Sequence, residues 1–104
     1  MVIHFNKKIE KSLSSKEEIK KNYTKFYKKI VIRLSELSYA KNLASIPTMK
    51  KPARKHKLSG DLKEYWSVDI SPNYRLLFKP YYSNVQDESK ITEIQIEKII
   101  DDHK

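Results

Sequence analysis

The sequence contains no cysteine, which excludes disulfide bonds and thiolate metal sites. It has one glycine and four prolines, too few for a sandwich built on many tight turns. No apolar run approaches the roughly 18 residues that a membrane span requires. Residues 1–8 place an apolar stretch before their charges, the reverse of a secretory signal. These absences predict a protein that stays in the cytoplasm and does not enter a membrane.

Positive charge is what the sequence has in excess. Its 22 lysines and arginines outnumber 13 aspartates and glutamates, which gives a net charge of +9. Such a charge attracts polyanions, so RNA, DNA, an anionic membrane or an acidic protein could be the partner. The lysines between residues 16 and 29 also have a plainer interpretation, as the solvated face of a helix. The length of 104 residues suffices for one core, and we expect a single domain over residues 1–104.

The first half of the chain has helical patterns. Residues 2–5 are expected to form a strand, and residues 6–13 a short helix. Apolar residues then recur at steps of three and four, which predicts one long amphipathic helix over about residues 15–40. Two overlapping capping boxes mark its start: Ser14 with Glu17 and Ser15 with Glu18.

Alternating patterns in the second half predict a sheet. Strands are expected at residues 54–58, 65–70, 74–78 and 91–100. In the last strand the core face is expected to carry Ile94, Ile96 and Ile100, which places Asp101 and His103 together on the other face. The order of elements predicts an α+β fold, with N-terminal helices packed on one face of a twisted, mainly antiparallel sheet of four to five strands.

Common motifs of catalysis and cofactor binding are missing. The sequence has no phosphate-binding glycine loop, no zinc-protease motif and no nucleophile elbow. Metal sites need several His, Cys or carboxylate ligands close together, whereas His4, His56 and His103 are scattered. We therefore expect neither a metal ion nor a cofactor.

One long, ordered motif stands out in residues 54–78. It consists of His56, Leu58, Gly60-Asp61, Trp66-Ser67-Val68 and Asn73-Tyr74-Arg75. This segment resembles the HigB branch of the RelE/ParE toxin superfamily. Two flanking stretches are also similar to those toxins: Arg33-Leu34 to Ile46-Pro47, and Ile99-Ile100-Asp101-Asp102-His103. The resemblance covers about residues 30–103.

The resemblance implies the toxin of a type II toxin–antitoxin pair with a RelE-like fold. Toxins of the HigB kind enter the ribosomal A site and cleave mRNA there without a metal, which inhibits translation. A helix-turn-helix antitoxin from the adjacent gene commonly holds them inactive. The implied partners are therefore the antitoxin, the ribosome and mRNA. DNA would be reached only indirectly, through the antitoxin complex, and no membrane partner is implied.

The resemblance also assigns roles to individual residues. His56 and His103 would share the proton transfers, Asp101 would orient one of them, and Arg75 would stabilise charge on the phosphate. This chemistry suits attack by a ribose 2′-OH. Four further residues are expected to bind RNA, with Tyr65 stacking on a base: Lys55, Lys57, Tyr65 and Asn73.

Departures from the family pattern keep other interpretations open. Ser59, Glu64 and Asp102 stand where the toxins usually have Lys, Gly and Tyr. A weakened or non-cleaving member that binds RNA or a protein is one alternative, and a gyrase-targeting toxin of the ParE type is an example. A basic structural protein of the nucleoid is another. Arg75 has a structural alternative as well, in an ion pair with Asp61 or Asp69.

Overall fold

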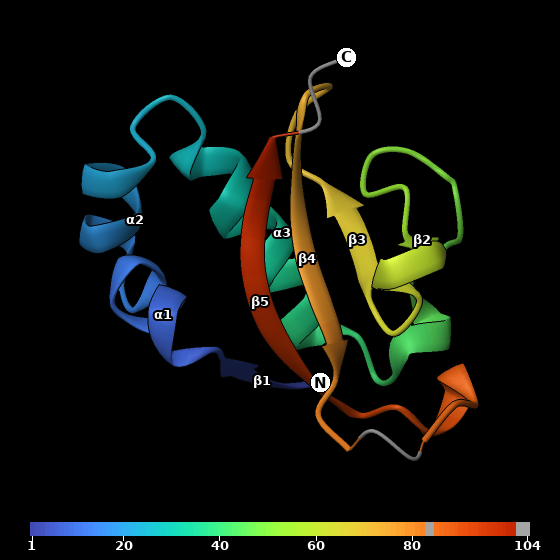
Figure 1. The fold of residues 1–104 in the computed structure, drawn as a ribbon. Helices are drawn as coiled ribbons and strands as arrows, with labels where there is room; N and C mark the ends of the chain where they lie inside the picture. The colour runs from blue at the N-terminus through green and yellow to red at the C-terminus, as the bar shows by residue number, and fades with distance from the viewer. Residues whose placement is uncertain (83–84, 102–104) are drawn as a thin grey trace.

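The computed structural model describes residues 1–82 and 85–101. Five strands and three α-helices make up the fold, together with short 3₁₀ turns labelled η (Figure 1). In chain order the elements are β1 (Val2–Phe5), α1 (Lys7–Glu10), η1 (Lys11–Leu13), α2 (Lys16–Asn22), α3 (Tyr27–Tyr39), η2 (Leu43–Ser45), β2 (His56–Lys57), η3 (Gly60–Leu62), β3 (Trp66–Asp69), β4 (Tyr74–Pro80), η4 (Glu88–Lys90) and β5 (Glu93–Asp101). Within these ranges no helix has the length and apolar character needed to cross a bilayer.

The strands form one mixed sheet in the order β1-β5-β4-β3-β2. Strands β2 to β5 pair antiparallel with their neighbours, whereas β1 pairs parallel with residues 93–96 of β5. β4 lies between two partners, as its apolar run predicts. The arrangement confirms the predicted α+β class with a mainly antiparallel sheet.

Helix α3 covers one face of the sheet and builds the core with it (Figure 1). Ile30 and Leu37 of α3 are buried against core residues of the central strands, among them Leu76, Phe78, Ile94 and Ile96. Burial of a side chain of this size contributes about 1.5–3 kcal/mol relative to exposure. Arg33 Nε of the same helix donates to the Asp69 carbonyl at 2.6 Å and so ties α3 to β3. The packing of α3 on this face holds the strands of the sheet in place, and it thereby also positions the side chains on the opposite face.

The helix expected over residues 15–40 is in fact two helices, α2 and α3. Ser15 caps α2, as one of the two capping boxes predicts. Tyr23 then leaves helical geometry, at φ −134° and ψ 48°, and Thr24 Oγ1 donates to the Lys20 carbonyl at 2.8 Å. A threonine hydroxyl that binds a carbonyl of the preceding turn competes with the helical hydrogen bonds. The apolar spacing continues across this break, so the pattern alone predicted one helix.

A β-bulge reverses the alternation of side chains near the end of β5. The register between β4 and β5 shifts between Leu77 and Phe78, which leaves Glu97 as an extra residue on β5. Beyond the bulge, Ile99 rather than Ile100 packs against the core. The expectation that Ile100 shares the core face with the two earlier isoleucines is therefore wrong.

Strand β2 is shorter than the strand expected over residues 54–58. Arg54 adopts a φ of 47°, which ends the extended backbone there. Lys55 forms its bridge with Thr48 rather than with β3. His56 therefore begins a two-residue strand at the edge of the sheet.

Candidate functional site

The face of the sheet opposite α3, called the open face from here on, carries a row of side chains from four strands. His56 pairs with Ser67, Ser67 with Leu77, and Leu77 with Lys98. Paired residues of neighbouring strands point to the same face, and Leu77 alternates with core residues of β4. This His56 row runs from the edge strand β2 to β5.

His56 is the titratable group at the edge of this row. Its side chain is half-exposed, and among the described residues no hydrogen bond or ion pair engages its ring. The neighbouring Ser67 is fully buried, and its hydroxyl has no hydrogen-bond partner within the described ranges. An accessible imidazole can accept or donate a proton near neutral pH. The placement of His56 is therefore compatible with acid–base chemistry.

Arg75 lies one row further along the open face, in register with Asp69. Arg75 Nε is 3.7 Å from Asp69 Oδ1, and Arg54 Nη1 is 3.4 Å from Asp69 Oδ2. The structural alternative for Arg75, an ion pair with Asp69, is thus confirmed. Two guanidinium groups therefore face one carboxylate at this corner of the open face, and a guanidinium is a group that binds phosphate oxygens.

The two lysines expected to bind RNA lie away from the His56 row. Lys55 is 1% exposed, and its Nζ donates to the Leu43 carbonyl at 2.8 Å and to Glu88 Oε1 at 2.5 Å. This burial argues against an RNA contact and gives Lys55 a structural role. Lys57 is exposed, but its ammonium donates to the Lys63 carbonyl and lies 5.3 Å from the ring centroid of Trp66, which faces the core.

The bulge carries Asp101 to the face opposite His56. Asp101 pairs with Tyr74 and lines an apolar hollow with Phe26 and Ile99 on the helical side of the sheet. The expectation that it joins His56 and Arg75 is not met. His103 and Asp102 lie outside the described residues. Asn73 is exposed in the turn before β4.

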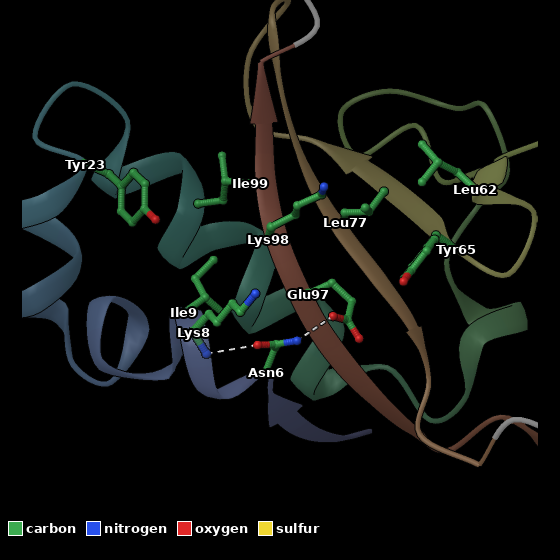
Figure 2. A pocket seen from close by; sticks show the side chains of 10 residues that line it. All are labelled: Asn6, Lys8, Ile9, Tyr23, Leu62, Tyr65, Leu77, Glu97, Lys98 and Ile99. Carbon is green, nitrogen blue, oxygen red and sulfur yellow. Dashed lines mark hydrogen bonds between the residues drawn. The ribbon is translucent and has the colours of Figure 1, made fainter.

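A pocket of about 430 Å³ opens on the open face beside the His56 row. Figure 2 shows residues of the N-terminal helices on one side of β5, and Leu62 and Tyr65 on the other. The pocket is lined by Asn6, Lys8, Ile9, Tyr23, Leu62, Tyr65, Leu77, Glu97, Lys98 and Ile99. Leu77 and Lys98 belong to the His56 row, and Tyr65 directly precedes β3. We call it the open-face pocket.

The floor of this pocket holds a charged network centred on Glu97. Its side chain is 10% exposed and accepts a hydrogen bond from Asn6 Nδ2 at 2.8 Å (Figure 2). It also accepts a hydrogen bond from Gln95 Nε2 at 3.0 Å, and Lys79 Nζ lies 3.3 Å away. Burial alone would raise the pKa of Glu97, but the hydrogen bonds from Asn6, Gln95 and Lys79 outweigh it and lower the pKa. Glu97 is therefore ionised at neutral pH.

Tyr65 stands beside this network. Lys79 Nζ lies 5.8 Å from its ring centroid. Desolvation, followed by the negative charges of Glu97 and Glu64, raises the pKa of the Tyr65 hydroxyl. Tyr65 therefore stays neutral and presents an aromatic ring to the pocket.

The lowered pKa of Glu97 predicts a loss of stability in acid. Ionised Glu97 stabilises the folded state above its ordinary pKa of 4.5, and this contribution disappears as the pH falls through the folded-state value below it. We expect Glu97→Gln to show a flatter decline of melting temperature between about pH 6 and pH 3 than the parent chain. Glu10→Gln, at an exposed carboxylate of α1, is the matched control. Parallel curves for the parent and Glu97→Gln would contradict the prediction.

Several residues of the pocket could not be predicted from the sequence. Lys98 faces the open side because of the bulge, and no pattern in the sequence marks that bulge. Asn6 and Tyr23 reach the pocket because α1 and α2 flank β5, which is a matter of tertiary packing. Tyr65 alone was selected in advance, from its alternation with Trp66.

Comparisons with known proteins bear on the fold. The sequence matches no family model and no curated protein. A histidine-to-glutamine variant of YafQ from E. coli is similar in structure, with a TM-score of 0.59 and 16% identity over 95% of this chain and 90% of that chain. A YoeB/ParE toxin from Agrobacterium tumefaciens has a TM-score of 0.59 and 14% identity over all of both chains. YafQ from E. coli strain BL21(DE3) has a TM-score of 0.52 and 16% identity over 95% and 90%. The chain thus has the fold of these proteins, the RelE-like fold.

Proposed function

We propose that this protein is the toxin of a type II toxin–antitoxin system, an endoribonuclease that cleaves mRNA in the ribosomal A site. The observation that carries the proposal is the placement of His56 and Arg75 on one face of the sheet. They are two strands and two residues apart, roughly 12 Å between Cα atoms at usual sheet spacings. A histidine and an arginine side chain can span that gap around one phosphate. The fold that this chain shares with the YoeB/ParE toxin from Agrobacterium tumefaciens supports the same conclusion.

The reaction follows from these two groups. A ribose 2′-OH attacks the adjacent phosphorus, its proton passes to a base, and the departing 5′-oxygen receives a proton from an acid. Arg75 stabilises the negative charge that develops on the phosphate oxygens. His56 supplies one proton transfer, and His103 remains our candidate for the other. Because Asp101 faces the helical side, we leave it out of direct contact with the phosphate.

The antitoxin, the ribosome and mRNA are the proposed partners. The test is induced expression with and without the protein encoded by the adjacent gene, with mRNA ends mapped on translating ribosomes. We expect growth arrest and new mRNA ends within A-site codons, both suppressed by the neighbour. Growth arrest without new ends would refute the nuclease.

The net charge of +9 predicts strongly salt-dependent binding to ribosomes or RNA. Each phosphate contact made by Lys or Arg releases counterions and adds about −0.7 to the slope of log K against log salt for single strands. Several contacts give a slope of about −2 or steeper. The measurement is ribosome or RNA binding between low and physiological salt. A slope near zero would exclude a phosphate-rich partner.

A non-cleaving toxin that binds a protein such as gyrase is the second candidate. Two observations favour it: Asp69 already engages Arg75, and Asp101 faces away from His56. This candidate predicts growth arrest with intact mRNA and with damaged or relaxed DNA. The same expression experiment therefore distinguishes the two.

A further inference from the structure

The open-face pocket combines the groups that recognise a nucleotide. Its volume of about 430 Å³ lies within the usual range for small-ligand sites. Tyr65 offers an aromatic ring, while Ile9, Leu62 and Leu77 provide apolar walls. Lys98 adds an exposed cation at the rim. An aromatic ring beside a lysine suits an unpaired base and its phosphate.

The pocket lies beside the place where His56 acts, not on it. Leu77 lines the pocket and is two strands from His56 in the same row, a distance of roughly 10 Å at a strand spacing of about 4.8 Å. A nucleotide held there is therefore not the one whose phosphate lies between His56 and Arg75. It is a neighbour in the same RNA strand.

We propose that the open-face pocket is a nucleotide subsite, which takes one unpaired base of the RNA against Tyr65 and places its phosphate on Lys98. The inference rests on the proposed function, because it concerns the same RNA strand. The inference adds to the proposed function a set of residues that binds a neighbouring nucleotide of that strand.

Glu97 sets the orientation of the nucleotide. Three donors hold its carboxylate in place, and a carboxylate has about four acceptor positions, so one remains for an N–H of a base. Its negative charge repels a phosphate, whereas Lys98 and Lys8 attract one. The base therefore points to the pocket floor and the phosphate to the lysines at the rim.

Titration of the full chain with nucleotides, followed by amide NMR, tests the subsite. Adenosine 5′-monophosphate should shift the resonances of Tyr65, Lys98 and Ile99, and cytidine 5′-monophosphate should bind more weakly because its ring stacks over less area. Ribose 5-phosphate, which lacks a base, should bind at least about 5-fold more weakly than the adenine nucleotide. Equal binding of ribose 5-phosphate would show a phosphate site only and would overturn the proposal.

Variants locate the binding on the pocket. Tyr65→Leu should weaken adenine nucleotide binding about 5- to 100-fold, the usual effect of losing one stacking ring, whereas Tyr65→Phe should retain it. Leu62→Trp fills the pocket from η3 and should abolish binding. Ile32→Trp adds the same bulk at an exposed position of α3 and should not affect it. Undiminished binding to Leu62→Trp would overturn the subsite.

Failure of the subsite and failure of the nuclease have different signatures. A chain that binds the adenine nucleotide in the pocket but cuts no mRNA supports the subsite and refutes the nuclease. A chain that cuts mRNA while no pocket resonance responds to nucleotides refutes the subsite and leaves the nuclease in place.

Discussion

Replacement of His56 by glutamine should lower ribosome-dependent mRNA cleavage by roughly 10²–10⁴-fold, the usual contribution of a positioned acid or base. Glutamine keeps much of the size and polarity of the side chain but does not exchange a proton near neutral pH. His56 is half-exposed at the edge of the sheet, so stability should change by no more than about 0.5 kcal/mol. The measurement pairs the cleavage rate on translating ribosomes with a melting curve.

His4→Gln is the matched control for this variant. His4 is partly exposed on β1, where its ring stacks on Tyr81 and its Nε2 lies 3.1 Å from Glu93 Oε1. It is outside the His56 row, so cleavage should stay at the parent rate. If His56→Gln cuts as fast as the parent while His4→Gln slows, the acid–base role of His56 is wrong.

Replacement of Lys55 by methionine should destabilise the fold strongly. Methionine fills much of the space of the methylene chain but removes the ammonium that binds the Leu43 carbonyl and Glu88. An unsatisfied buried acceptor costs about 1–3 kcal/mol. Glu88 is 35% exposed and regains water, so the carbonyl dominates the loss. In a domain of this size the melting temperature should fall by roughly 5–20 °C.

Lys57→Met is the control. Lys57 is the exposed lysine two residues further along the chain, so this substitution should change the free energy of unfolding by no more than about 0.5 kcal/mol. Together the two variants distinguish a lysine that stabilises the fold from a lysine that binds RNA. A Lys55→Met chain that melts like the parent but loses RNA binding would restore the RNA contact that the burial of Lys55 argues against.

Patterns in the sequence predict what depends on local alternation. The strand over residues 65–70 was expected from the alternation of Trp66, Val68 and Ile70, and all three of these residues are buried. The break after α2 escaped prediction because the apolar steps of three and four run through it unchanged. A hydroxyl such as that of Thr24 signals a helix end only in hindsight, since threonine also occurs within helices.

The candidate site shows the same division. His56 and Arg75 were selected from a motif and Tyr65 from its alternation with Trp66, and the structure places all three on the open face. Lys55 belongs to the same motif, yet its ammonium is buried by η2 and η4, which lie far from it in the sequence. Asp101 was placed on the wrong face because a single extra residue in β5 reverses every side chain after it.

The parallel pairing of β1 with β5 has a consequence for the order in which the protein is made. Val2 pairs with Glu93, about 90 positions further along the chain. Until β5 has been synthesised, β1 has no neighbour in the sheet and β4 lacks one of its two partners. Contacts between such distant segments also form slowly. If the protein cuts mRNA on ribosomes, a nascent copy cannot complete its sheet, and so cannot act on the ribosome that makes it, until residues 93–101 have left the exit tunnel.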